Sequence, residues 1–97
     1  MAIVVTVTVP DAGAEAYAAV IDRLTDGKGF TSLSDVPAAG LVAHVTGPVD
    51  GGWRVIDVWD SQEAYEAFTA TLRPIVEELG IGPLQPQITP AHSVVLH

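Results

Sequence analysis

The fold is decided by the stretch Gly51–Leu79, which reads GGWRVIDVWDSQEAYEAFTATLRPIVEEL. The alternation from Trp53 to Trp59 fits a β-strand. The next four residues, Asp60–Glu63, have the form of an N-terminal capping box, and apolar residues then recur at helical spacing. The sequence therefore predicts a strand that leads directly into an amphipathic helix over Ser61–Leu79, kinked or restarted at Pro74.

Three further strands are expected around this unit. Ala2–Val9 is rich in β-branched residues and apolar on both faces, which favours a central strand. Leu41–Thr46 is joined to Trp53–Trp59 through an Asp-Gly turn signal, so these two strands should pair as an antiparallel hairpin. The last strand, about Gln87–Leu96, contains Pro90, which a sheet tolerates at an edge or a bulge.

A first helix is expected over Ala12–Thr25, with Asp11 as its N-cap and a glycine-rich stop after it. Its buried stripe consists of Tyr17, Ala18, Ile21 and Leu24. The segment from Phe30 to Gly40 keeps no period and is interpreted as a loop. Its apolar residues Phe30, Leu33 and Val36 could fold over a cavity mouth or merely cover the end of the first helix.

The resulting order, β-α-β-β-α-β, predicts a ferredoxin-like α+β fold in a single domain over residues 1–97. With right-handed crossovers the four-stranded antiparallel sheet takes the strand order 4-1-3-2, and both helices lie on one face. The other face is then uncovered and apolar. Such a face usually marks an interface, so we expect a homodimer through the sheet faces.

Composition excludes several classes of function. No run of apolar residues is long enough to span a membrane, and Met1 leads straight into a strand, so a cytoplasmic protein is expected. Twelve acidic residues oppose four scattered basic ones, which argues against a nucleic acid or an anionic membrane as partner. Cys is absent, so neither a disulfide nor a thiolate nucleophile is available.

The hairpin register assigns its side chains to two faces. Pairing Thr46 with Trp53 sets His44 opposite Val55, and Asp57 diagonally across from His44. One face then carries Val42, His44, Thr46, Trp53, Val55, Asp57 and Trp59, and the other carries Leu41, Ala43, Val45, Arg54, Ile56 and Val58. A slip of one residue would exchange the two faces.

The mixed face holds the candidate catalytic residues. A carboxylate beside an imidazole fixes its tautomer and strengthens it as a general base, so His44 and Asp57 are candidates for proton abstraction. Tyr65 could donate a hydrogen bond to a developing oxyanion. The plainer interpretation is that Asp57 is an edge or interface carboxylate and that His44 is a satisfied core imidazole.

Four aromatic residues could form a wall against a planar ligand, or simply fill the core: Trp53, Trp59, Tyr65 and Phe68. No metal site is expected, because the three His have no ligand spacing and His92 falls on the opposite edge strand from His44. No nucleotide or nucleophile motif is present, and no cofactor is expected.

At Val58–Tyr65, VWDSQEAY, the chain resembles the dimeric α+β barrel superfamily, and within it the antibiotic biosynthesis monooxygenase-like proteins. The resemblance extends to element order and length over almost the whole chain. It implies a family whose members include oxygenases that convert phenols to quinones without metal or flavin, haem-degrading enzymes, polyketide cyclases and proteins without known activity. Trp59 matches the Trp of the haem-degrading branch, but the chain has no Asn and no His on its second helix.

Three functions remain open on these grounds. The first is a cofactor-independent monooxygenase for an aromatic or polyketide-like small molecule, with His44 as base, Asp57 as orienting carboxylate, Tyr65 as donor and Trp59 as stacking wall. The second is a polyketide cyclase that uses the same base. The third is a non-catalytic dimeric binding or scaffold protein, because family membership does not fix activity.

Overall fold

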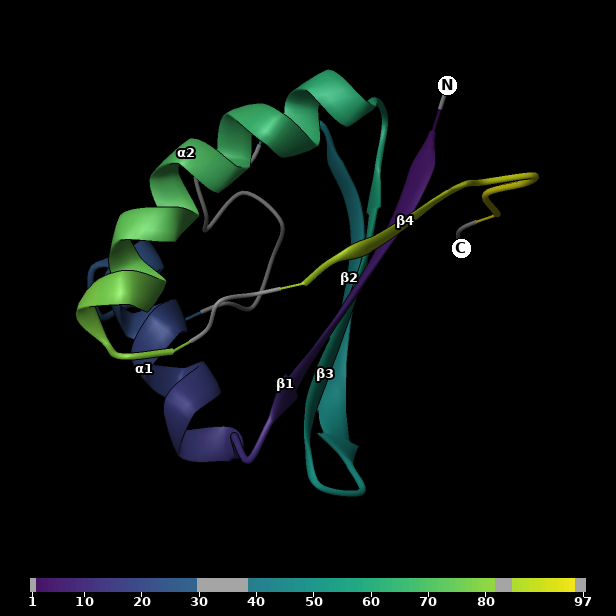
Figure 1. Cartoon of the computed structure of the whole chain (residues 1–97). Helices are drawn as coiled ribbons and strands as arrows, with labels where there is room; N and C mark the ends of the chain where they lie inside the picture. Colours follow the sequence, from purple (N-terminus) through teal and green to yellow (C-terminus); the bar gives the residue numbers. More distant parts are fainter. Residues whose placement is uncertain (1, 30–38, 82–84, 96–97) are drawn as a thin grey trace.

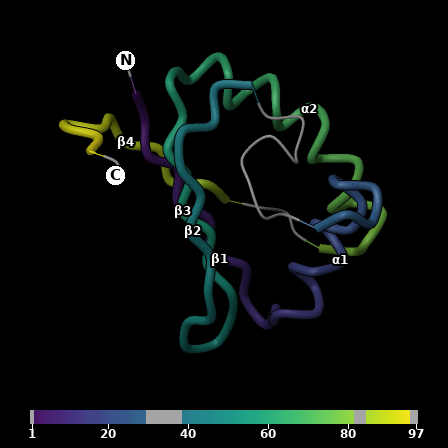
Figure 2. Tube along the Cα trace, turned by 180° about the vertical axis from the view of Figure 1, so that it is seen from behind, coloured from purple at the N-terminus to yellow at the C-terminus, as the bar shows by residue number. Residues whose placement is uncertain are grey.

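The computed structural model describes residues 2–29, 39–81 and 85–95. The element order is β1 (Ile3–Pro10), α1 (Ala14–Thr25), β2 (Leu41–Val49), β3 (Gly52–Trp59), α2 (Gln62–Glu78) and β4 (Gln87–Pro90). The four strands form one antiparallel sheet in the order β2-β3-β1-β4, which confirms the predicted ferredoxin-like topology. Both helices lie on one side of this sheet, as Figures 1 and 2 show from opposite directions.

Strand β1 is central, as its two apolar faces predict. It pairs with β3 over its whole length and with β4 from Ile3 to Thr6. Ile3 and Val5 are buried on the helix side of the sheet, where Trp59 completes the core cluster. Ala64, Tyr65 and Phe68 of α2 pack against this cluster and anchor the helix layer at one end of the sheet.

The β2–β3 hairpin is longer than predicted and has a different register. Strand β2 continues to Val49, which pairs with Gly52 across a two-residue turn. Thr46 therefore pairs with Val55 and not with Trp53, a shift of two residues that leaves the side chains from Ala43 to Thr46 on their predicted faces. The shift also sets His44 directly opposite Asp57, where the sequence predicted a diagonal pair.

A register irregularity between Leu41 and Ala43 overturns one part of the face assignment. Leu41 pairs with Trp59 and Ala43 with Val58, so the residue between them is unpaired and the alternation is interrupted. Leu41 consequently packs against the core cluster on the helix side, and its predicted place on the aliphatic face is wrong.

Helix α1 begins two residues later than predicted, and Asp11 is not its N-cap. The N-cap is Gly13, which provides no side-chain hydrogen bond. Asp11 has a φ of 60° and donates its backbone N–H to the Gly51 carbonyl at 2.7 Å. Asp11 therefore lies in the turn after β1 and binds the hairpin turn through its backbone, and it is not part of the helix.

Helix α2 begins one residue later than predicted, and its N-cap is Ser61 and not Asp60. The Ser61 hydroxyl accepts a hydrogen bond from the Ala64 backbone N–H at 3.1 Å. The reciprocal half of a capping box is absent because the third helical residue is Ala64 and not a glutamate. The helix continues through Pro74 to Glu78, so no restart occurs there.

Strand β4 is shorter than the predicted Gln87–Leu96. It ends at Pro90, since residues 91–95 form no strand, and its position at the sheet edge agrees with the proline. The predicted roles of Phe30, Leu33 and Val36 fall outside the described residues.

The sheet face opposite the helices carries no helix in the described part of the chain (Figure 1). Register and strand alternation put Val4, Val45, Ile56 and Val58 on this face. Val45 leaves 63% of its surface exposed. None of the helices over residues 2–29, 39–81 and 85–95 is long and apolar enough to cross a membrane.

Candidate functional site

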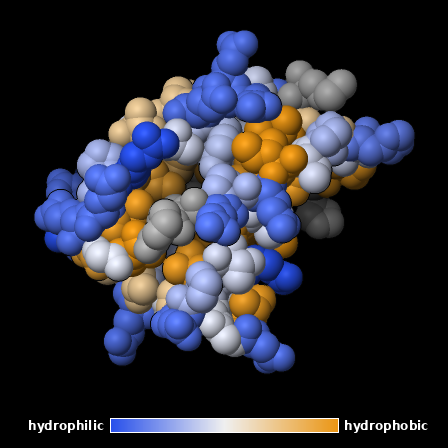
Figure 3. All heavy atoms as spheres, in the orientation of Figure 1, coloured by the Kyte–Doolittle hydropathy of each residue, from blue (hydrophilic) through white to orange (hydrophobic). Residues whose placement is uncertain are grey.

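A cavity of about 650 Å³ lies between the sheet and the two helices. Its walls come from β1, β2, β3, α1 and α2 and are mainly apolar, with Val5, Val7 and Val9 of β1 along its floor. Hydrophobic side chains are visible between the helix layer and the sheet in the space-filling view (Figure 3). The volume falls within the range of small-molecule sites, and all six residues singled out from the sequence line it.

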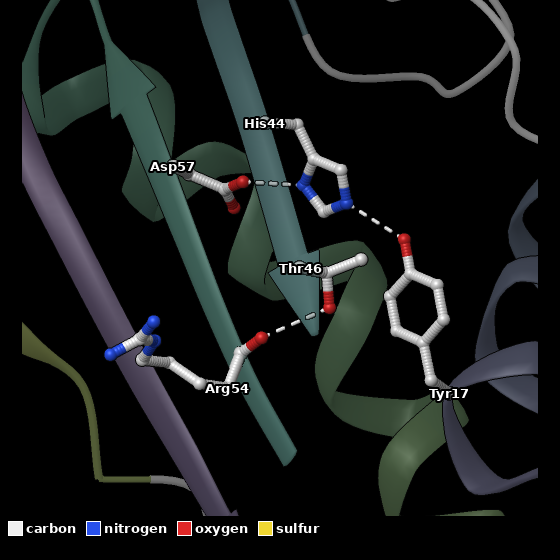
Figure 4. A network of polar contacts seen from close by, with 5 residues as sticks. All are labelled: Tyr17, His44, Thr46, Arg54 and Asp57. Carbon is white, nitrogen blue, oxygen red and sulfur yellow. Dashed lines mark hydrogen bonds and ion pairs between the residues drawn. The ribbon is translucent and has the colours of Figure 1, made fainter. Parts of the chain in front are cut away.

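His44 and Asp57 form the polar centre of this cavity. They face each other on β2 and β3, and the imidazole Nδ1 lies 2.5 Å from the Asp57 Oδ1 (Figure 4). Both side chains are about 15% exposed, so the pair is largely withdrawn from water. Because a carboxylate oxygen can only accept, Nδ1 carries the proton, and in the neutral imidazole the lone pair lies on Nε2.

Tyr17 is the member of the site that sequence reasoning missed. Its hydroxyl lies 2.7 Å from the His44 Nε2, so α1 and the hairpin meet in a line of three polar side chains, Tyr17, His44 and Asp57 (Figure 4). The helical period placed Tyr17 correctly on the buried side of its helix. Nothing in the sequence indicates that its hydroxyl contacts an imidazole 27 residues further along the chain.

The aromatic residues form two groups on opposite sides of the pair. Trp59 is fully buried, and the Phe68 ring packs against it at 5.3 Å and the Tyr65 ring at 5.9 Å, edge-on. Trp53 instead stacks on Tyr17, with 5.5 Å between the ring centroids. Trp59 is thus a core residue as well as a cavity wall, and Trp53 holds the tyrosine that contacts His44.

Two indole N–H groups are buried without a hydrogen-bond acceptor in the part of the chain that the structure describes, those of Trp53 and Trp59. Buried donors of this kind are rare in native proteins, because an unmade hydrogen bond costs free energy. Both residues line the cavity, but the two N–H nitrogens themselves have almost no exposed surface, so a ligand in the cavity does not reach them unless the indole rings move.

Burial is the main reason why the pKa values of the two cavity tyrosines are raised. Burial, and secondarily the Asp57 carboxylate, raises the pKa of Tyr17 above its ordinary value of 10.0. Burial raises the pKa of Tyr65 in the same way, Asp57 adds to this effect, and Arg73 partly opposes it. Both phenols therefore remain hydrogen-bond donors at neutral pH.

Metal-binding geometry is absent from the residues described. No group of three His, Asp, Glu or Cys residues among them could hold a metal ion. His92 lies exposed beyond β4 and is not part of the cavity wall.

No protein-family model and no curated protein matches the sequence, whereas solved structures match the fold. SnoaB, a cofactor-independent oxygenase from Streptomyces nogalater, is similar at 14% identity and a TM-score of 0.61 over 99% of this chain and 97% of that one. The monooxygenase ActVA-Orf6 from Streptomyces coelicolor, in complex with nanaomycin D, has 20% identity and a TM-score of 0.58 over 98% of this chain and 91% of its own.

A candidate antibiotic biosynthesis monooxygenase from Chloroflexus aurantiacus has a TM-score of 0.64 at 12% identity, over 98% of this chain and 97% of that chain. At such identities the likeness establishes the fold and leaves the chemistry to be argued from the site. The chain therefore shares its ferredoxin-like α+β fold with these monooxygenase structures.

Proposed function

We propose that this protein is a cofactor-independent monooxygenase that acts on an aromatic or polyketide-like phenol. The observation that carries the proposal is the His44–Asp57 pair, held at 2.5 Å on the wall of an apolar cavity of about 650 Å³. The fold shared with SnoaB, described as a cofactor-independent oxygenase, supports the same class of reaction.

The walls favour a planar, largely apolar substrate. Tyr65, Phe68 and Trp53 offer ring faces and edges on which an aromatic system can stack, and the fully buried Trp59 supports the first two rings from behind. The bound nanaomycin D reported for ActVA-Orf6 is a ligand of that related fold, and it supports a small organic molecule here.

The negative charge of the chain favours a substrate that enters the cavity as a neutral phenol. The chain has a net charge of −8, and among the residues described the cavity wall carries one arginine, Arg73, and two carboxyl groups, those of Asp57 and Glu77. Such a site offers little attraction for an anion. The substrate should therefore lose its proton inside the cavity, where a base is required.

His44 is assigned as that base. It takes the phenolic proton on Nε2, and Asp57 stabilises the imidazolium through the Nδ1–H bond. The resulting carbanion transfers electrons to dioxygen and forms a C–O bond, and protonation gives a hydroperoxide. Loss of water then breaks the O–O bond and leaves a carbonyl, so one oxygen atom enters the quinone and the other leaves as water.

Tyr65 is assigned as the donor that stabilises charge on the substrate oxygen. Its raised pKa keeps the phenol protonated, so it can donate a hydrogen bond to a developing oxyanion. Phe68 would hold the ring system against Tyr65, and Trp59 would fix both side chains by packing behind them.

A homodimer through the uncovered sheet faces is part of the proposal. Val45, Ile56 and Val58 share that face, and a second copy would withdraw them from water. The cavity lies on the other side of the sheet, so each protomer would keep its own site.

The experiment that tests the function is dioxygen consumption with a panel of naphthols and hydroxylated anthracene derivatives. Wild-type protein should consume dioxygen and form quinone, and His44→Ala should lower kcat by about 10² to 10⁴-fold. His92→Ala makes the same chemical change outside the cavity and should leave kcat unchanged.

Two results would overturn the proposal. Cyclisation of a poly-β-ketone under nitrogen, with no oxidation of the phenols in air, would indicate cyclase chemistry by the same base. If no phenol is oxidised and none stabilises the protein against heating, the protein is a non-catalytic scaffold.

A further inference from the structure

The ring nitrogen that the proposed reaction needs already has a partner. His44 Nε2 lies 2.7 Å from the Tyr17 hydroxyl, while Nδ1 is held by Asp57 at 2.5 Å. With the Nδ1 proton directed to the carboxylate, the neutral imidazole accepts on Nε2 and Tyr17 donates. A substrate hydroxyl must therefore either displace Tyr17 or act through it.

We infer that Tyr17 is a catalytic residue that passes the substrate proton to His44. This inference rests on the proposed function, because it assumes that a phenolic or enolic proton is removed in the cavity. The proton path then includes Tyr17 of α1 in addition to His44 and Asp57, which both lie on the β2–β3 hairpin.

The position of Tyr17 suits a relay better than displacement. Its ring is stacked on Trp53 at 5.5 Å with an interplanar angle of 29°, so swinging the phenol away would break an aromatic contact as well as a hydrogen bond. Tyr17 also lines the cavity. Its oxygen can accept a hydrogen bond from a ligand there while its own proton is directed at His44.

The step is balanced with no further reactant. The substrate O–H bond breaks as a new O–H bond forms on Tyr17, and the original Tyr17 proton moves to the His44 Nε2. The products are a substrate anion, a neutral Tyr17 and an imidazolium paired with the Asp57 carboxylate. Tyr17 begins and ends as a phenol, which agrees with a pKa raised by burial and by the nearby carboxylate.

The test compares two matched variants, Tyr17→Phe and Tyr65→Phe, which remove the two tyrosine hydroxyls of the chain one at a time. The probe is a naphthol in mixtures of light and heavy water, followed in two ways. Dioxygen consumption reports oxygenation, and deuterium exchange at the naphthol ring under nitrogen reports deprotonation without it.

The relay predicts that Tyr17→Phe slows both reactions by about 10²-fold, a loss typical of one acid–base group. It also predicts a curved dependence of the wild-type rate on deuterium content, since two protons move together, and a linear dependence in Tyr17→Phe. Tyr65→Phe should keep the curved dependence, because the hydroxyl that contacts the His44 Nε2 is that of Tyr17.

Different failures have different meanings. A Tyr17→Phe variant with wild-type rates, or with lower thermal stability but unchanged isotope dependence, would show that Tyr17 only ties α1 to the sheet and would overturn the relay. Wild-type exchange under nitrogen without dioxygen uptake would overturn the oxygenase and leave the relay standing, provided that Tyr17→Phe slows that exchange. Wild-type protein that catalyses neither reaction would overturn both.

Discussion

At the scale of single residues, the two tyrosines report on the cavity through their ionisation. Tyr17 and Tyr65 are the only tyrosines of the chain, and burial raises the pKa of both above 10.0. We predict that the tyrosinate absorbance of the folded protein develops at higher pH than that of the protein in denaturant. The variants Tyr17→Phe and Tyr65→Phe assign the two contributions. A folded titration that overlays the denatured one would contradict the buried environment.

The same shifts predict how stability changes at alkaline pH. Above about pH 10 the unfolded chain loses phenolic protons that the folded chain still holds, so the free energy of unfolding decreases as the pH rises. Denaturant unfolding at a series of alkaline pH values measures this slope. In Tyr17→Phe the slope should be smaller, because one raised pKa is removed.

The residue scale is also where prediction from sequence was least complete. Residue type and strand alternation placed His44 and Asp57 together on the helix side of the sheet. Their direct pairing depends on register, and the register is set by a turn that closes after Val49, three residues beyond the expected end of β2. Tyr17 was assigned to a buried stripe, because periodicity identifies the face of a helix and not the atom that a hydroxyl meets across the fold.

At the scale of elements, the hairpin is positioned by a close approach of two backbones. A Cβ added at Gly52 would lie 2.3 Å from the Val9 carbonyl oxygen, and the atoms around it belong to the backbone of β1. A Cβ added at Gly47, in the partner strand β2, would meet nothing within 4 Å. Gly52 therefore lets β3 pair with β1 at the end of the hairpin, and Gly47 has no such role.

This difference predicts unequal effects of the same substitution. Gly52→Ala should lower the free energy of unfolding by about 2 kcal/mol or more, because backbone atoms must move, whereas Gly47→Ala should change it by less than about 0.5 kcal/mol. Urea unfolding followed by tryptophan fluorescence measures both. Equal effects of the two variants would contradict the close approach.

Element order, strand order and the placement of both helices on one face followed from the sequence, because hydrophobic period and crossover handedness leave few topologies. The ends of the helices and strands were predicted less accurately from the sequence. Asp11 has the residue type of an N-cap, but the fold uses it in the link to the hairpin turn. The register irregularity between Leu41 and Ala43 places the Leu41 side chain on the opposite face from the predicted one, and no local sequence pattern indicates this irregularity.

At the scale of the whole molecule, a small chain leaves a cavity where a core would otherwise lie. Among the described hydrophobic residues only Ile3, Val5, Trp59 and Val76 are buried, although 48% of the chain is hydrophobic. A chain of this size has little buried surface to spare. An apolar cavity of about 650 Å³ is thus a structural cost that a bound ligand, and a partner on the opposite sheet face, would offset.

The proposed dimer predicts a specific response to charge. Val45→Glu introduces a carboxylate on the uncovered face, where burial against a second copy would require its desolvation. Sedimentation velocity at micromolar concentration should give a dimer for the wild type and a monomer for Val45→Glu. Ala67→Glu adds the same charge on the exposed side of α2 and should remain dimeric. A monomeric wild type would refute the sheet-face interface.

The most direct measurement of the central claim is a crystal structure of the protein with a naphthol bound under nitrogen, where oxygenation cannot consume it. We predict the ring system between the sheet and the helices, against Tyr65 and Phe68, with its hydroxyl oxygen within hydrogen-bond distance of the Tyr17 hydroxyl. A naphthol that binds outside the cavity, or inside it with its hydroxyl turned away from the line of Tyr17, His44 and Asp57, would contradict the account.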